Sequence, residues 1–171
     1  ILVFIFTNAM PALGGALGWD WLANISWFGT PSMATVTIIV VSIWQNIGFL
    51  MIIYTAGLQT IPKDVMESAE LDGCSGLKKV LKIELPLLMP TVTINLFVSI
   101  SGAFKSFDIP NAMTGGGPYG STMPVAMNIY QEAFTKYNLG YGSAKSVILF
   151  LTVAAVTLIQ LYCTRKKEVE Y

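Results

Sequence analysis

Three apolar runs, each long enough to cross a lipid bilayer, constrain this chain more than any other feature of its sequence. They cover residues 33–58, 87–107 and 141–162. At a rise of about 1.5 Å per residue, a helix of this length crosses roughly 30 Å of hydrocarbon. A further run at residues 1–7 has neither an initiator Met nor a basic segment, so we interpret it as the end of a truncated span rather than a signal peptide. The sequence therefore predicts an all-α, polytopic transmembrane helical bundle.

The composition agrees with a membrane protein and excludes several functions. Of the 171 residues, 54% are hydrophobic and 12% are charged, about half the charged fraction of a typical soluble domain. The net charge is zero and no basic stripe with interleaved aromatics is present, so we expect no nucleic-acid partner. Histidine is absent and no Ser/Lys or paired-carboxylate arrangement replaces it, so we expect no catalytic residues. Cys74 and Cys163 lack metal-ligand spacing, so we expect no metal site.

The distribution of cations predicts which loops face the cytoplasm. Seven of the ten lie in two segments, as Lys63, Lys78, Lys79, Lys82, Arg165, Lys166 and Lys167. By the positive-inside rule, the loop at 59–86 and the tail at 163–171 are cytoplasmic. The loops at 8–32 and 108–140 then face outward. They carry aromatic residues suited to the headgroup level, namely Trp19, Trp21, Trp27, Tyr130 and Tyr137.

The cytoplasmic loop at 59–86 has the pattern of two short amphipathic helices joined by a glycine turn. For the first helix, Thr60 is the expected N-cap residue and Pro62 falls in the first turn. Its apolar face comprises Ile61, Val65, Met66 and Ala69. Gly73 is expected to end this helix with a positive φ.

The second helix of the loop is expected to begin with Ser75 as its N-cap residue and to end at Leu85-Pro86. Its apolar strip comprises Leu77, Val80 and Leu81, with Lys78, Lys79 and Lys82 facing away. A helix pair of this kind either lies on the membrane surface or docks onto a cytoplasmic partner. Small residues at Ser68 and Ala69, beside a glycine turn, favour docking because they permit close backbone approach.

The spacing of this loop resembles a known signature. Glu67-Ser68-Ala69, three residues, Gly73, nine residues and Ile83-Glu84-Leu85-Pro86 are similar to the EAA loop of permeases of ATP-binding cassette (ABC) importers, of the MetI-like superfamily. Six of the seven specified positions match, and Ser68 replaces an alanine of similar size. The stretches at 111–118 (NAMTGGGP) and 138–144 (NLGYGSA) resemble the carbohydrate-uptake subfamily, in particular its first, maltose- or glycerol-phosphate-type permease subunit.

This resemblance implies an ATP-driven, binding-protein-dependent importer of sugars or oligosaccharides that works by alternating access. The implied coupling residues, which dock onto an ATPase, are Glu67, Ser68, Ala69, Asp72, Gly73, Leu85 and Pro86. In these roles Glu67 makes a polar contact, Ala69 permits a close fit and Gly73 shapes the turn. ATP and Mg would bind to the partner ATPase, so this chain would hold no cofactor.

The resemblance also implies the partners and the location of the chain. Its partners would be a second permease subunit, a cytoplasmic ATP-binding subunit dimer, an extracytoplasmic solute-binding protein and membrane lipid. Its location would be the inner membrane of a prokaryote, as a multi-pass protein. The whole chain would be the C-terminal part of one permease domain.

Two polar helix faces are candidates for the substrate path, because polar side chains within spans are costly. On the first complete span the face comprises Ser42, Gln45, Asn46 and Phe49, and on the second Ser99, Gly102, Ala103 and Ser106, with Asn95 one turn inward. The resemblance implies that these faces line a sugar site. Ordinary helix packing is the alternative, because small residues at this spacing also form contacts between spans.

Several residues and alternative functions stay open at this point. Lys105, Asp108 and Lys145 lie near the outer ends of spans, where snorkelling to the headgroups is expected for Lys145 and a contact to substrate or binding protein is the alternative. Thr114–Pro118 could form a rigid turn that contacts the binding protein. Alternative cargoes are a polyol or glycerol phosphate, with peptides disfavoured by the TGGGP stretch. Alternative classes are an ion-coupled secondary transporter or channel and a membrane enzyme.

Overall fold

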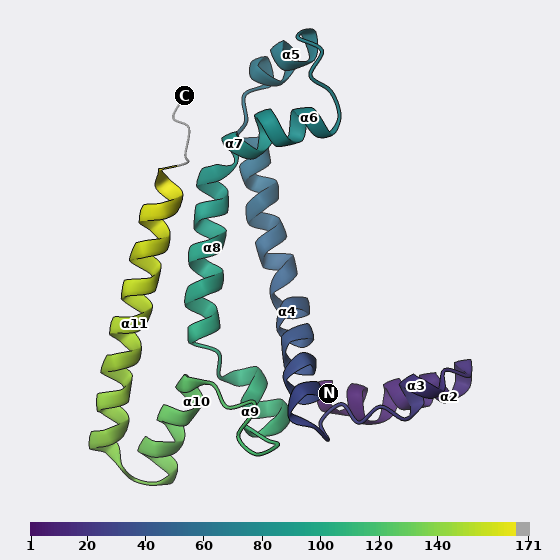
Figure 1. The fold of residues 1–171 in the computed structure, drawn as a ribbon, viewed down its shortest axis with the longest axis vertical. Coiled ribbons are helices and arrows are strands. Elements are labelled where there is room, and N and C mark those ends of the chain that lie inside the picture. The colour runs from purple at the N-terminus through teal and green to yellow at the C-terminus, as the bar shows by residue number, and fades with distance from the viewer. Residues whose placement is uncertain (167–171) are drawn as a thin grey trace. The chain divides into compact units, whose positions relative to one another are not determined.

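The computed structural model describes residues 1–166, and these residues form helices and turns without any strand (Figure 1). The predicted all-α class is therefore confirmed. Lys167 and the remainder of the expected cytoplasmic tail lie outside the described residues. The chain divides into two compact units. Unit 1 comprises Ile1–Gln45 and Lys105–Ser146, and unit 2 comprises Asn46–Phe104 and Val147–Tyr171.

Two helices are long and apolar enough to cross a membrane on their own. They are α4 (Pro31–Gln59) and α11 (Leu139–Arg165), and they correspond to the runs at 33–58 and 141–162. Each extends beyond its apolar run by a few residues at both ends. In both helices every interior backbone N–H group can bond within the helix, as a hydrocarbon environment requires.

The third run, at 87–107, forms a shorter helix than expected. Helix α8 spans Met89–Phe104, and a preceding helix over Leu77–Leu87 meets it at a 69° bend. Pro90 lies in the first turn of α8, where its missing N–H group is tolerated. Pro86 lies in the preceding helix, before the bend. Because Pro90 has no N–H group to donate to the Pro86 carbonyl, the helical ladder weakens at this bend.

Both expected outward loops contain helices, which corrects the sequence interpretation. The helical segment at the first apolar run does not end at residue 7, because α1 (Leu2–Phe4), the π-helix η1 (Ile5–Ala9) and α2 (Met10–Leu17) continue without a break. Gly18 ends α2 with a φ of 69°. The short α3 (Asp20–Ala23) then folds back against α2. The segment at 108–140 contains α9 (Asp108–Thr114), α10 (Val125–Tyr130) and the π-helix η3 (Gln131–Thr135).

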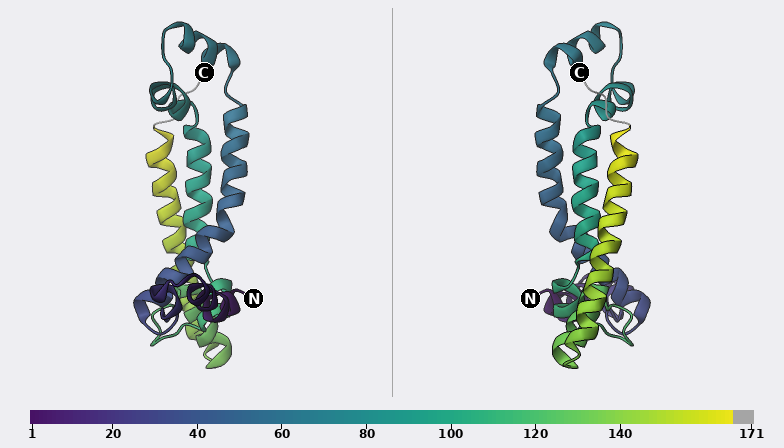
Figure 2. Two further views of the ribbon diagram at one scale, coloured as in Figure 1. Left: turned by 90° about the vertical axis from the view of Figure 1, so that its right-hand side faces the viewer. Right: turned by 90° about the vertical axis from the view of Figure 1, so that its left-hand side faces the viewer.

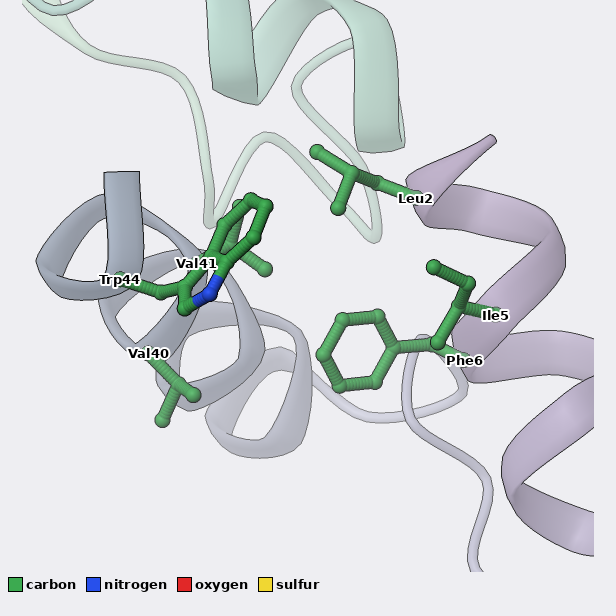
Figure 3. Close-up of a pocket in the computed structure, with 6 residues that line it drawn as sticks. All are labelled: Leu2, Ile5, Phe6, Val40, Val41 and Trp44. Atoms are coloured by element: carbon green, nitrogen blue, oxygen red, sulfur yellow. The ribbon is translucent and has the colours of Figure 1, made fainter.

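A small apolar core holds unit 1 together. It is formed by Phe6 of η1, Val41 of α4 and Met113 of α9. Trp27 packs edge-on against Phe6, with ring centroids 5.2 Å apart, so this residue of the expected outward loop lies against the core. Beside the core is an apolar pocket between η1 and α4, lined by Leu2, Ile5, Phe6, Val40, Val41 and Trp44 (Figure 3).

In unit 2, helix α8 packs closely against the C-terminal part of α4. Gly57 lies so near α8 that a Cβ atom at this position would overlap the side chain of Thr91. Glycine thus lets two spanning helices approach at short distance, as small residues commonly do in membranes. The close approach matters for function because it lies where both helices enter the loop at 59–88.

We predict that Gly57→Ala destabilises the packing of α4 on α8 by about 1–3 kcal/mol, because the added methyl group forces a shift of Thr91 or of the backbone. The measurement is thermal unfolding of the purified full-length protein in mild detergent. Gly48→Ala is the matched control on the same helix, since among residues 1–166 no atom would lie within 4 Å of its Cβ beyond the glycine's own chain neighbours and helix backbone. Equal melting temperatures for the two variants would contradict the prediction.

Candidate functional site

The loop at 59–88, which joins α4 to α8, contains the first helix of the predicted pair. Helix α5 spans Lys63–Leu71, and Pro62 is its N-cap residue. The prediction that Thr60 caps this helix is wrong, because the Thr60 hydroxyl donates to the Gly57 carbonyl at 2.7 Å and so closes the end of α4. The extended backbone of Pro62 then separates the two helices.

The turn after α5 has the conformation that the sequence predicted. Gly73 has a φ of +73°, in the region that glycine enters without the steric cost of a side chain. The backbone N–H of Cys74 donates to the Ala69 carbonyl at 2.9 Å, and that of Gly73 donates to the Glu70 carbonyl at 3.0 Å. These two bonds satisfy carbonyl groups at the end of the helix and fix the direction of the turn.

The second helix of the loop is longer than predicted and begins differently. It comprises α6 (Leu77–Lys79), the π-helix η2 (Val80–Glu84) and α7 (Leu85–Leu87). Gly76 is the N-cap residue with a φ of +58°, so the prediction of Ser75 is wrong. Leu85-Pro86 does not end the helix, which continues to Leu87 before the bend into α8.

One ion pair joins the two helices of the loop. Lys79 Nζ lies 2.6 Å from Glu70 Oε1, and the Lys79 side chain is only 16% exposed. Lys79 therefore turns back toward α5, a contact that the sequence analysis did not predict. The hydrogen bond from Lys79, together with its charge, holds the pKa of Glu70 below its usual value of 4.5. Gly73 and Gly76 lie between Glu70 and Lys79 in the sequence, so the ion pair closes the turn that contains both glycines.

The predicted coupling residues fall into an exposed group and a covered group. Glu67, Ser68, Asp72 and Gly73 are exposed on α5 and the turn. Ala69 is 5% exposed, and its carbonyl accepts the hydrogen bond from the Cys74 amide of the turn. Leu85 is exposed and Pro86 half-buried, at the other end of the second helix. Ala69 is therefore the covered member of the predicted set on α5.

Two leucines beside the turn were not among the predicted coupling residues. Leu71 is 90% exposed and Leu77 is 80% exposed, although leucine is usually buried. They flank the Gly73 turn, with Leu71 at the end of α5 and Leu77 at the start of α6. Leu71 has a sequence signal, since it is a single large apolar residue between Glu70 and Asp72. Exposed apolar residues that gather at one place mark an interaction surface.

The predicted substrate-path residues do not all lie as expected. Gln45, Asn46 and Phe49 are exposed on α4, and the Ser42 hydroxyl donates to the Ile38 carbonyl at 2.8 Å. On α8, Ser99, Gly102 and Ala103 are exposed. Asn95 is buried at 3% exposure, so it does not share their open face. Ser106 lies beyond α8, which ends at Phe104, so the predicted helical position of Ser106 is wrong.

A charged cluster in unit 1 was missed by the sequence interpretation. Glu132 of η3 is 9% exposed; its carboxylate lies 2.8 Å from Lys136 Nζ and 3.6 Å from Lys145 Nζ. Lys145 also donates to Asn128 Oδ1 at 2.7 Å and lies 4.4 Å from the centre of the Tyr141 ring. Lys145 thus binds α10 and η3, and the prediction that it snorkels is wrong.

Hydrogen bonding lowers the pKa of Glu132. The bond from Lys136 is the largest cause and burial opposes it, while the charges of Lys136 and Lys145 and a bond from Asn138 add to the lowering. The carboxylate therefore stays ionised and holds the start of α11 against η3. Gly142 permits this close packing, since a Cβ atom there would lie 2.8 Å from Ala133 Cβ.

The glycine-rich stretch at 114–118 forms a turn held by two threonines. The hydroxyl oxygens of Thr114 and Thr122 lie 2.7 Å apart, and the Thr122 hydroxyl donates to the Gly117 carbonyl at 2.5 Å. Gly115 and Gly116 both have positive φ values. The side-chain bonds across the turn agree with the predicted rigidity.

These features define a class of protein: an all-helical membrane protein whose long apolar helices flank a polar helix–glycine–helix loop. Comparison with known sequences identifies the family. The chain belongs to the family described as binding-protein-dependent transport system inner membrane component, whose profile matches residues 1–169. This membership places the chain among transport permeases rather than among enzymes.

Individual relatives agree with this assignment. The chain is 36% identical over 167 residues, 98% of its length, to the probable starch degradation products transport system permease protein AmyD of Thermoanaerobacterium thermosulfurigenes. It is 40% identical, over 85% of its length, to the sulfoquinovosyl glycerol transport system permease protein SmoG of Agrobacterium fabrum. It is 35% identical, over 96% of its length, to the sn-glycerol-3-phosphate transport system permease protein UgpA of Brucella abortus. The matches cover 56%, 47% and 56% of these relatives, so the chain spans about half their length.

We predict that Glu132→Gln lowers the melting temperature of the full-length protein and weakens its dependence on acidic pH. Because the folded protein depresses the pKa of Glu132 below 4.5, the carboxylate stabilises the fold above the unfolded pKa. That stabilisation is lost as the pH falls through the lower folded value. The measurement is the melting temperature in detergent between about pH 7 and about pH 3. Parallel pH profiles for the wild type and the variant would contradict the role of Glu132.

Proposed function

We propose that this chain is part of the membrane-spanning subunit of an ATP-driven, binding-protein-dependent importer of sugars or oligosaccharides. Family membership supports this proposal, as do the similarities to permease proteins named for starch degradation products and for sulfoquinovosyl glycerol. The protein works in the inner membrane of a prokaryote as a multi-pass subunit, with the loop at 59–86 and the tail at 163–171 in the cytoplasm. Its partners are a second permease, an ATP-binding subunit dimer and an extracytoplasmic binding protein.

The observation that carries this proposal is the exposed turn of the loop at 59–88. Glu67 and Asp72 place two carboxylates there, and Leu71 and Leu77 add apolar area. Exposed apolar side chains with charged residues around them are typical of a surface that binds another protein. The partner is the ATPase, which binds ATP and Mg and hydrolyses the nucleotide.

The connection from the loop to the membrane supports a coupling role. The helix at Leu77–Leu87 joins α8 through the single residue Leu88, within unit 2 (Figure 1). The Glu70–Lys79 ion pair and the Gly73 turn tie α5 to this helix. A helical connection transmits a rigid-body displacement, whereas a slack linker would absorb it. Closure of the ATPase would thus move α8.

The substrate path is proposed to run along the exposed polar faces of α4 and α8. Gln45, Asn46 and Phe49 supply amides and an aromatic ring, which suit hydrogen bonding and stacking with a neutral sugar. Ser99, Gly102 and Ala103 supply a small-residue face on α8. Lys145, the charged residue within the apolar run at 141–162, is already paired with Glu132 and Asn128. This pairing favours a neutral cargo.

The second candidate cargo is a glycerol phosphate, because the chain is similar to a permease protein named for it. A phosphate group needs a cationic partner. Lys105, which is exposed just after α8, is the nearest cation in sequence to the proposed path. The substitution Lys105→Met distinguishes the two cargoes. If the cargo is glycerol phosphate, the variant should lose uptake of that solute. If the cargo is a neutral sugar, the variant should take it up as the wild type does.

Purification of the complete protein from its native membranes tests the proposal. An ATPase subunit should copurify, and its ATP hydrolysis in proteoliposomes should rise when the solute-binding protein is added with one member of a panel of sugars. Glycerol 3-phosphate and a polyol belong in the same panel. Uptake driven by an ion gradient without an ATPase would overturn the proposal.

We predict that Gly73→Val reduces ATP-dependent uptake by about tenfold or more, since a β-branched residue at positive φ costs on the order of 1–3 kcal/mol and changes the turn. Gly73→Asn is the matched variant, because asparagine enters this conformation far more readily. It should retain most of the uptake. The measurement is sugar uptake into proteoliposomes at equal amounts of assembled transporter. Equal uptake by the two variants would show that the turn conformation is not required.

A further inference from the structure

Helix α8 is held to both of its neighbours in unit 2 by side-chain amides. The amide nitrogen of Asn95, on α8, donates to the Leu50 carbonyl of α4 at 3.5 Å. The amide nitrogen of Gln160, on α11, donates to the Thr93 carbonyl of α8 at 3.4 Å. Both views in Figure 2 show α8 lying between these parts of α4 and α11. The two residues, Asn95 and Gln160, are called the amide clasp below.

Both amides of the clasp are incompletely bonded in this arrangement. Among the described residues, Asn95 Oδ1 and Gln160 Oε1 are buried acceptors without a donor. The two N···O distances are long compared with the usual 2.9–3.0 Å. An unpaired buried amide oxygen is costly, and more so in hydrocarbon. Two large polar side chains are thus kept inside a helical bundle although this arrangement does not satisfy them.

Simple packing accounts poorly for this pair of residues. Helices in membranes approach through small residues, as Gly57 and Thr91 do within the same bundle. A leucine would fill the space of Asn95 or Gln160 without leaving an unpaired oxygen. Because each oxygen is buried, a donor can reach it only if the surrounding helices rearrange or a water molecule enters with them. The two amide oxygens of the clasp can therefore accept hydrogen bonds that would form only after a displacement of α8.

We infer that Asn95 and Gln160 are positioning residues that change hydrogen-bond partners when α8 moves between two arrangements during transport. The inference rests on the proposed function, since the displacement of α8 originates in the coupling loop. In the arrangement described here both interhelical bonds of the clasp are long, while Gln160 also donates to the Thr164 hydroxyl of its own helix at 3.2 Å. In the second arrangement its oxygens gain donors and stabilise the displaced helix, so the clasp sets the balance between the two states.

The test uses the assembled transporter in proteoliposomes, with Asn95→Leu and Gln160→Leu as variants. Each removes a hydrogen-bonding group and keeps a similar volume. We expect binding-protein-stimulated sugar uptake to fall about fivefold or more, the range of a typical coupling effect. The melting temperature of the resting complex should not fall by more than about 2 °C, because the interhelical bonds lost are long and the unpaired oxygens are removed with them.

Thr152→Val on α11 and Thr55→Val on α4 are the matched controls. Their side chains are exposed and their hydroxyl groups donate to carbonyls of their own helices, at 2.8 Å each. Both should transport as the wild type does. They show whether loss of any polar group from these spans affects uptake.

Two outcomes would overturn the inference. Unchanged uptake in both leucine variants would assign the clasp to packing alone. A fall in melting temperature that matches the fall in uptake would assign it to stability. Failure of the proposed function is recognised separately, because the wild-type transporter itself would then show no ATP-dependent uptake of any sugar in the panel.

Discussion

Backbone hydrogen bonding inside hydrocarbon is the constraint on which this structure depends. In hydrocarbon, where no water is available, a chain must satisfy its backbone N–H and C=O groups internally, and the interior of an uninterrupted helix such as α4 or α11 can do so. Breaks in the ladder then gather at the ends of spans, where prolines and glycines are tolerated. Pro86 and Pro90 bracket one break, and Gly73 and Gly76 shape the turn of the loop. The loop between α4 and α8 and the bend exist because these residues interrupt helices where the polar groups can find other partners.

The sequence sufficed for features that depend on local composition. Uninterrupted apolar runs located α4 and α11, because no other structure can bury so many apolar residues in lipid. Gly73 was identified as a helix end because positive φ is a local property of glycine. The caps were assigned incorrectly, since both helices begin at a later residue than a hydroxyl N-cap would give. The Thr60 hydroxyl bonds to the Gly57 carbonyl of α4, and Gly76 begins the following helix.

The sequence could not predict features that depend on which segments fold back beside one another. Lys145 was taken for a snorkelling residue, because nothing in the sequence shows that α10 and η3 fold back beside the start of α11 and present Asn128 and Glu132. Ala69 was assigned to an interface, and its side chain is only 5% exposed in this structure. Asn95 was placed on the face of Ser99 by helical periodicity, yet it is buried and its amide donates to the Leu50 carbonyl of α4. Each error concerns which neighbour a side chain meets, and that is decided by tertiary packing.

The 69° bend between Leu77–Leu87 and α8 has a mechanical consequence. The eleven residues before the bend form an arm about 16 Å long at 1.5 Å per residue. A rotation of about 10° around Leu88 would carry the far end of this arm through roughly 3 Å, by the same geometry. Conversely, a displacement of about 3 Å imposed at the far end of this arm, near Gly76, corresponds to a rotation of about 10° at Leu88, by the same geometry. In the proposed function, the arm would convert a displacement by the ATPase into a rotation at the start of α8.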